Sequence, residues 1–179
     1  MPVIPETLTS NGEVIPFSDE YFAPMTDSSS LRGDPAALRA RLQRDGYLLL
    51  RGALDPEKVL RLRAAYFSRL PAGYLKDGTE PVDGIYSGQV PEGTPAYGVA
   101  GHPAHDFVRS PEFQEFSADP TVRGLAEAVL QGPAEQLPRK IVRHFWNGSF
   151  RASRAHTDYD YMTRGTDQLV TTWSVPRVM

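Results

Sequence analysis

The chain contains no cysteine among its 179 residues. Disulfide scaffolds, thiolate zinc sites and cysteine nucleophiles are therefore excluded. A chain of this length, with 40% hydrophobic residues, is long enough to bury a core without cross-links, so a single domain is expected. The absence of cysteine does not identify a compartment, and the cytoplasm is taken as the default location.

The chain also lacks an excess of charge of either sign, because 19 Lys and Arg residues face 22 Asp and Glu residues. The net charge of -3 gives no electrostatic reason to expect binding to nucleic acid or to an anionic membrane surface. No segment approaches the roughly 20 consecutive apolar residues of a membrane span, and the N-terminus has no apolar run typical of a signal peptide. We therefore expect neither a nucleic-acid partner nor a membrane partner.

Proline and glycine divide the chain into an arm and several helices. Residues 1–33 carry isolated aromatic residues without a sustained period, so an irregular arm is expected. Asp-Pro pairs begin the segments 34–46, 55–70 and 119–132, each followed by apolar residues at helical spacing. Aspartate caps a helix and proline suits its first turn, so these three segments are predicted to be helices. Residues 34–179 are expected to form one domain.

A long segment at 71–103 is rich in glycine and proline but also carries Tyr74, Tyr86 and Tyr97. A loop of this length is a lid, a binding loop or a disordered segment. The tyrosines favour an ordered flap over a site, with disorder as the alternative.

Three other segments have the composition of strands. Residues 46–52 are a short apolar run between glycines, and residues 168–174 are rich in β-branched and aromatic side chains. In residues 141–146, Arg143 would face one side of a strand and His144 the other. Helices followed by strands predict an α+β fold.

A possible metal site lies at His156 and Asp158, two positions apart in a segment expected to be extended. Residues i and i+2 of a strand point to the same side, so an imidazole nitrogen and a carboxylate oxygen can converge on one ion. One more histidine would complete the 2-His-1-carboxylate triad that holds non-haem Fe(II). The alternative is a polar loop in which these side chains form hydrogen bonds. The position between two predicted strands, flanked by aromatic residues, favours the metal site.

The order of these segments resembles the phytanoyl-CoA dioxygenase family over about residues 34–174. The resemblance is carried by the Gly-Tyr-Leu-Leu-Leu-Arg-Gly run, the capped helix after it, the Ala-His-Thr-Asp motif and the downstream Thr-Trp pair. Members are Fe(II)- and 2-oxoglutarate-dependent oxygenases on a double-stranded β-helix, a jelly-roll or cupin-like fold. The resemblance implies N-terminal helices packed on such a barrel, His156 and Asp158 as iron ligands, and Trp173 beside the co-substrate 2-oxoglutarate.

The sequence departs from the family pattern after this motif. Members carry a distal histidine, followed by an arginine for the far carboxylate of 2-oxoglutarate, and the sequence reaches Met179 without such a segment. We therefore expect a partial barrel with its C-terminal half missing, impaired activity, and exposed strand edges that allow self-association. The alternative function is a non-catalytic fragment or degenerate paralogue that binds a partner strand.

Three further histidines precede the motif. His144 is the best local candidate for a third ligand, although its aromatic neighbours equally suit a core position. His102 and His105 are three positions apart, which fits metal binding on one helical turn, but a capping or solvated role is favoured.

Cationic side chains gather around the motif although the whole chain is acidic. They suit an anionic co-substrate or a carboxylated small-molecule substrate, or alternatively a solvated face with scattered ion pairs. Among them, Arg143 is our choice for the co-substrate site. A hydrolase that uses Asp158 and Asp160 as paired carboxylates has no other support in the sequence. The cations are Arg139, Lys140, Arg143, Arg151, Arg154 and Arg164.

Overall fold

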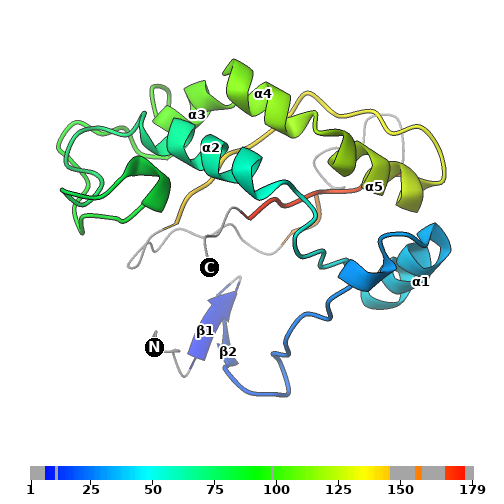
Figure 1. The fold of residues 1–179 in the computed structure, drawn as a ribbon. Helices are drawn as coiled ribbons and strands as arrows, with labels where there is room; N and C mark the ends of the chain where they lie inside the picture. The colour runs from blue at the N-terminus through cyan, green and yellow to red at the C-terminus, as the bar shows by residue number, and fades with distance from the viewer. Residues whose placement is uncertain (1–6, 11, 98, 146–155, 159–167, 176–179) are drawn as a thin grey trace.

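The computed structural model describes residues 7–10, 12–97, 99–145, 156–158 and 168–175. In this part of the chain, α2 runs alongside α4, α1 packs against α5, and a β-hairpin lies apart from the helices (Figure 1). None of the described helices is both long and apolar enough to cross a membrane. The elements are β1 (Thr7–Ser10), β2 (Glu13–Pro16), η1 (Ser29–Leu31), α1 (Pro35–Asp45), α2 (Pro56–Phe67), η2 (Pro81–Asp83), α3 (Pro103–Phe107), α4 (Pro111–Ser117) and α5 (Pro120–Leu130).

All five α-helices begin with proline after a residue whose side chain accepts a hydrogen bond from the first turn. The caps at Asp34, Asp55 and Asp119 confirm the three predicted helix starts. The end of α1 at Gly46 is also confirmed, and its φ of 76° suits glycine. Helix α2 is shorter than predicted, because it ends at Phe67 and not next to the proline at 71.

The prediction of an irregular N-terminal arm is wrong for residues 7–16. Here β1 and β2 pair antiparallel, with Thr7 opposite Pro16. The turn includes Gly12 with a φ of 92°, a conformation that glycine adopts without strain. The sequence signal for this hairpin is the Asn-Gly pair at 11–12 between β-branched residues.

The predicted strands do not form in the described residues. Residues 46–52 contribute a single parallel bridge from Leu49 to Asp27, where the Ser28 N–H donates to the Leu49 carbonyl at 2.8 Å. A longer strand would need a neighbouring segment to pair with its backbone N–H and C=O groups. Residues 141–145 and 168–175 are described and have no sheet pairing. The jelly-roll barrel therefore stays a prediction.

The hydrophobic core lies where α2, α3 and α4 meet. Its buried residues come from α2 (Leu62 and Tyr66), α3 (Ala104 and Phe107) and α4 (Phe113). The segment after α5 returns across these helices, since the side chain at position 142 packs against the same cluster (Figure 1). The alternation at 141–146 predicted a strand, but Val142 of this segment packs against helices instead.

Part of the long segment, around Tyr74 and η2, packs on α2 and is ordered, while its role as a flap over a site stays a prediction. Tyr74 is 3% exposed. The Arg63 side chain donates to the carbonyls of Val82 and Asp83, both at 3.0 Å, and so fastens η2 to α2. At Gly84 a Cβ would lie 2.6 Å from the ring of Phe67, so only glycine allows this approach.

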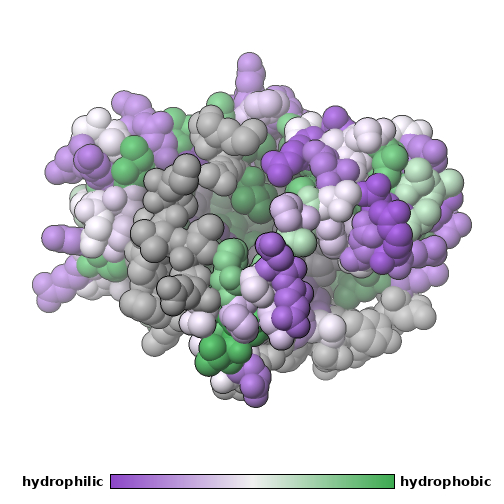
Figure 2. All heavy atoms as spheres, turned by 90° about the horizontal axis from the view of Figure 1, so that it is seen from below, coloured by the Kyte–Doolittle hydropathy of each residue, from purple (hydrophilic) through white to green (hydrophobic). Residues whose placement is uncertain are grey.

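Exposed apolar side chains occur mainly outside the helical core. Val14 on β2 is 64% exposed. Phe145, Trp173 and Val175 are 62%, 71% and 78% exposed. Seen from below, hydrophobic residues lie in small groups between hydrophilic ones (Figure 2).

Candidate functional site

The two predicted metal ligands lie next to each other. His156 Nε2 is 3.4 Å from Asp158 Oδ1, and both side chains are partly exposed. The two side chains approach each other without the extended segment that the sequence predicted, because residues 156–157 have no regular structure and Asp158 lies in a turn. Thr171 Oγ1 donates to Asp158 Oδ2 at 2.8 Å, which orients the carboxylate so that Oδ1 faces the imidazole. Thr171 was not predicted from the sequence, because the contact joins segments 13 residues apart.

This pair fits two positions of a divalent metal site. Ligand atoms about 2.1 Å from an ion lie about 3 Å apart when they occupy neighbouring octahedral positions. The observed 3.4 Å between nitrogen and oxygen is close to that spacing. Imidazole and carboxylate are two of the three ligands of the non-haem Fe(II) triad. Across the described ranges, no group of three His, Asp or Glu side chains gathers as a metal site.

His144 lies half-buried beside the helical core, where its ring packs against those of Tyr66 and Tyr74. The Tyr66 hydroxyl hydrogen-bonds to Nδ1, and the Tyr74 hydroxyl hydrogen-bonds to Nε2 at 2.9 Å. A neutral imidazole donates from one nitrogen and accepts at the other, so both nitrogens are used. Both ring nitrogens are thus engaged by tyrosines, and the described arrangement gives no support to His144 as the third ligand.

His102 caps α3, as the favoured alternative predicted. Its Nδ1 accepts from the Ala104 N–H at 3.1 Å, and the residue is 4% exposed. Its ring stacks on that of His144 with centroids 5.8 Å apart, and Tyr97 packs edge-on against His102 and His105. We call Tyr66, Tyr74, Tyr97, His102, His105 and His144 the His–Tyr cluster. The sequence contains no local signal for it, because its members come from four separate segments.

We expect acid to destabilise the fold through His144. Burial, reinforced by the nearby His102, lowers the pKa of His144 from 6.5 to about 4. The unfolded chain therefore takes up this proton before the folded protein does. The neutral His144 ring makes its full contribution to the free energy of unfolding above about pH 6.5. This contribution, roughly 1–2 kcal/mol after discounting for partial exposure, is lost as the pH falls toward about 4. Urea denaturation at a series of pH values measures it.

Two variants separate the causes. His144→Gln should flatten the stability curve between pH 6.5 and 4, because the titrating ring is gone. Tyr66→Phe removes a hydrogen bond but keeps the ring buried beside Tyr74 and His102, so the slope should remain. A wild-type slope equal to that of His144→Gln would contradict this account.

Arg143 lines a pocket of about 270 Å³ together with Arg139 and Lys140. We call it the cationic pocket. Neither His156 nor Asp158 belongs to its described lining. The pocket thus brings together three of the six predicted cations. The other three cations lie outside the described residues, and so does Asp160 of the hydrolase hypothesis. The full lining is Tyr97, Ala104, His105, Val108, Arg139, Lys140, Ile141, Val142 and Arg143, and the residues outside the description are Arg151, Arg154, Asp160 and Arg164.

Trp173 is 71% exposed, two residues after the threonine that holds Asp158. The backbone therefore brings the Trp173 segment to the His156–Asp158 pair. Its role beside a co-substrate stays a prediction.

Comparison with known proteins identifies no relative: no family model, no curated protein and no solved structure matches the chain.

Proposed function

We propose that the protein is a Fe(II)- and 2-oxoglutarate-dependent dioxygenase, resembling the phytanoyl-CoA dioxygenase family, that hydroxylates a small and preferably anionic molecule in the cytoplasm. The observation that carries the proposal is the approach of His156 Nε2 to Asp158 Oδ1 at 3.4 Å, with Thr171 holding the second carboxylate oxygen.

In this proposal His156 and Asp158 hold the metal, and Thr171 keeps the carboxylate turned toward it. When bound, Fe(II) would activate oxygen, so that 2-oxoglutarate is oxidised and a C–H bond of the substrate is hydroxylated. Among the cations near the motif, Arg143 is our choice to bind 2-oxoglutarate, and by the family resemblance Trp173 lies beside this co-substrate. Two protein ligands hold a metal loosely, so we expect weak turnover.

Titration of anaerobic protein with Fe(II) and 2-oxoglutarate tests the proposal. We expect a weak charge-transfer absorption band and slow formation of succinate, both lost in His156→Ala and Asp158→Ala. Thr171→Val should weaken metal affinity by about 10- to 100-fold, as loss of a residue that orients a ligand does. Asp106→Ala is the matched control, because Asp106 is exposed and forms only a 3.7 Å ion pair with Arg109. Wild-type protein without absorption and without succinate would exclude the activity.

A second candidate is a binding module that adds a partner strand to its own sheet. It is favoured by the β1–β2 hairpin, because a two-stranded sheet is marginally stable alone and both outer edges can pair with another chain. The exposed Val14 and Leu8 lie on these strands. Light scattering discriminates: a clean monomer at high concentration counts against self-association through these edges.

A further inference from the structure

We propose that the cationic pocket binds a small organic oxyanion, a carboxylate or a phosphate ester, that carries a short apolar chain. The inference concerns binding and does not require the iron chemistry proposed above. Arg139, Lys140 and Arg143 all line the pocket, and its described lining contains no Asp or Glu.

Within the described residues, no carboxylate pairs with Arg139 or Lys140. Several cations of the helical part do meet carboxylates, as Lys58 does with Asp119 at 2.7 Å. Lys140 Nζ instead donates to the neutral amide oxygen of Gln114 at 2.7 Å, and Arg139 forms no ion pair within the described ranges. Like charges in one concave surface repel one another and raise the local concentration of anions. An oxyanion that accepts hydrogen bonds from these cations would relieve the repulsion.

One side of the pocket is apolar and rigidly placed. Ala104 is 1% exposed and belongs to the hydrophobic core, and Val108 and Val142 pack against that core. Tyr97, His105 and Ile141 complete the lining, and the rings of Tyr97 and His105 have centroids 5.9 Å apart. The ligand must therefore offer an apolar body to the valine and isoleucine side chains as well as an anionic group to the cations.

The volume limits the size of this ligand. A pocket of about 270 Å³ is just below the roughly 300–1,000 Å³ of sites for drug-sized ligands, so it suits a molecule of about six carbons. A bare phosphate would leave the apolar wall uncovered. 2-Oxoglutarate, with two carboxylates on a short chain, would leave that wall poorly filled as well.

Calorimetric titration of the full chain, in low salt and with a chelator to remove metals, tests the inference. The probes are hexanoate, hexyl phosphate, inorganic phosphate, 2-oxoglutarate and hexylamine. We expect at least one of the two hexyl anions to bind about tenfold or more tightly than inorganic phosphate and 2-oxoglutarate, and hexylamine not to bind. The better hexyl anion identifies the head group. Failure of both, or equally tight binding of inorganic phosphate or 2-oxoglutarate, overturns the inference without bearing on the iron site.

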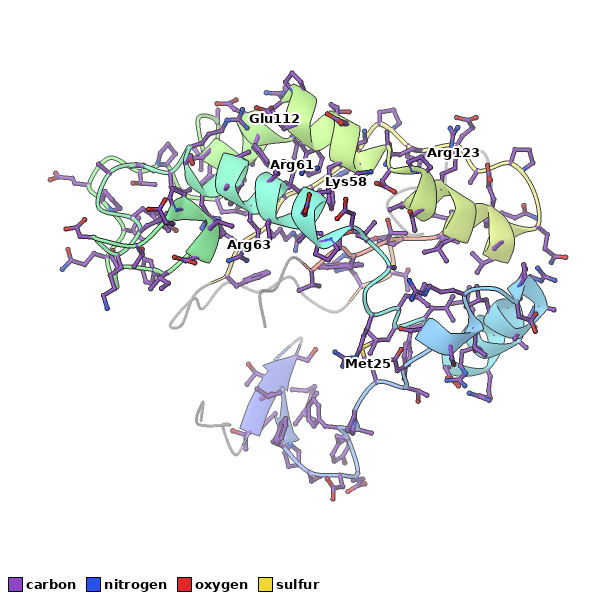
Figure 3. All side chains as sticks on the ribbon, viewed as in Figure 1. Met25, Lys58, Arg61, Arg63, Glu112 and Arg123 are labelled. Carbon is purple, nitrogen blue, oxygen red and sulfur yellow. The ribbon has the colours of Figure 1, made fainter. Side chains whose placement is uncertain are left out.

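A double variant locates the binding. The double variant Arg139→Gln with Lys140→Gln should weaken the binding of the better hexyl anion by about tenfold or more, because two charged hydrogen-bond donors are removed. The control is Arg61→Gln with Arg123→Gln, which removes the same charge from α2 and α5 (Figure 3). Both control residues are exposed and form only 3.7 Å ion pairs. Equal weakening in both double variants would show an effect of net charge and would overturn the inference.

Discussion

Phe107→Ala is expected to lower the free energy of unfolding by about 3–5 kcal/mol. Phe107 is 1% exposed, and its ring lies 5.1 Å from that of Tyr66 and 5.7 Å from that of Phe113. The Arg69 guanidinium lies over the same ring at 4.8 Å. Truncation therefore removes the buried ring surface and leaves a cavity where three helices meet, since Phe107 comes from α3, Tyr66 from α2 and Phe113 from α4.

Phe145→Ala provides the matched control, because the same side chain is removed from a position that is 62% exposed. It should change the free energy of unfolding by less than about 1 kcal/mol. Urea denaturation of both variants measures the difference. A loss at Phe145 as large as that at Phe107 would contradict the placement of the core.

Asp119→Ala is expected to lower the free energy of unfolding by about 2 kcal/mol, since it removes both a helix cap and a charged hydrogen bond. Asp119 is 6% exposed; its carboxylate accepts from the Thr121 N–H at 2.9 Å and from Lys58 Nζ at 2.7 Å. The bond from Thr121 caps α5, and the bond from Lys58 ties the start of α5 to the start of α2, where Lys58 lies (Figure 3).

The same carboxylate predicts a loss of stability in strong acid. The hydrogen bond from Lys58, with that from Thr121, lowers the pKa of Asp119 from 3.8 to about 2. The stabilisation is therefore complete above about pH 4 and is lost as the pH falls toward about 2, a window below that of His144. Asp119→Asn, which can still accept the Thr121 N–H, should recover about half of the alanine effect and abolish this acid step. Retention of the step in the Asn variant would assign it to another group.

Local sequence predicted the starts of three helices and the two members of the candidate metal pair. The hydrogen bonds of Asp34, Asp55 and Asp119 reach only two or three residues along the chain, so Asp-Pro pairs predict helix starts without knowledge of the fold. His156 and Asp158 are also close along the sequence, but a turn at Asp158, and not the expected strand geometry, accompanies their approach.

The strand predictions failed in the described residues because the composition of a strand does not provide its partner. The run that contains Leu49 meets only the backbone at Asp27 and Ser28, and one bridge results. The alternation at 141–145 is satisfied by packing Val142 against helices. The hairpin at 7–16 carried an Asn-Gly signal, which short flanking strands and nearby prolines obscured.

Only the tertiary structure decided where the histidines and the central cations lie. His144 hydrogen-bonds to Tyr66 and Tyr74 across separations of 78 and 70 residues, and Arg139 and His105 line the same cationic pocket. Both placements require the segment after α5 to return across α2 and α3. The return buries apolar surface against the helical core, and burial depends on area and shape and not on spacing along the chain.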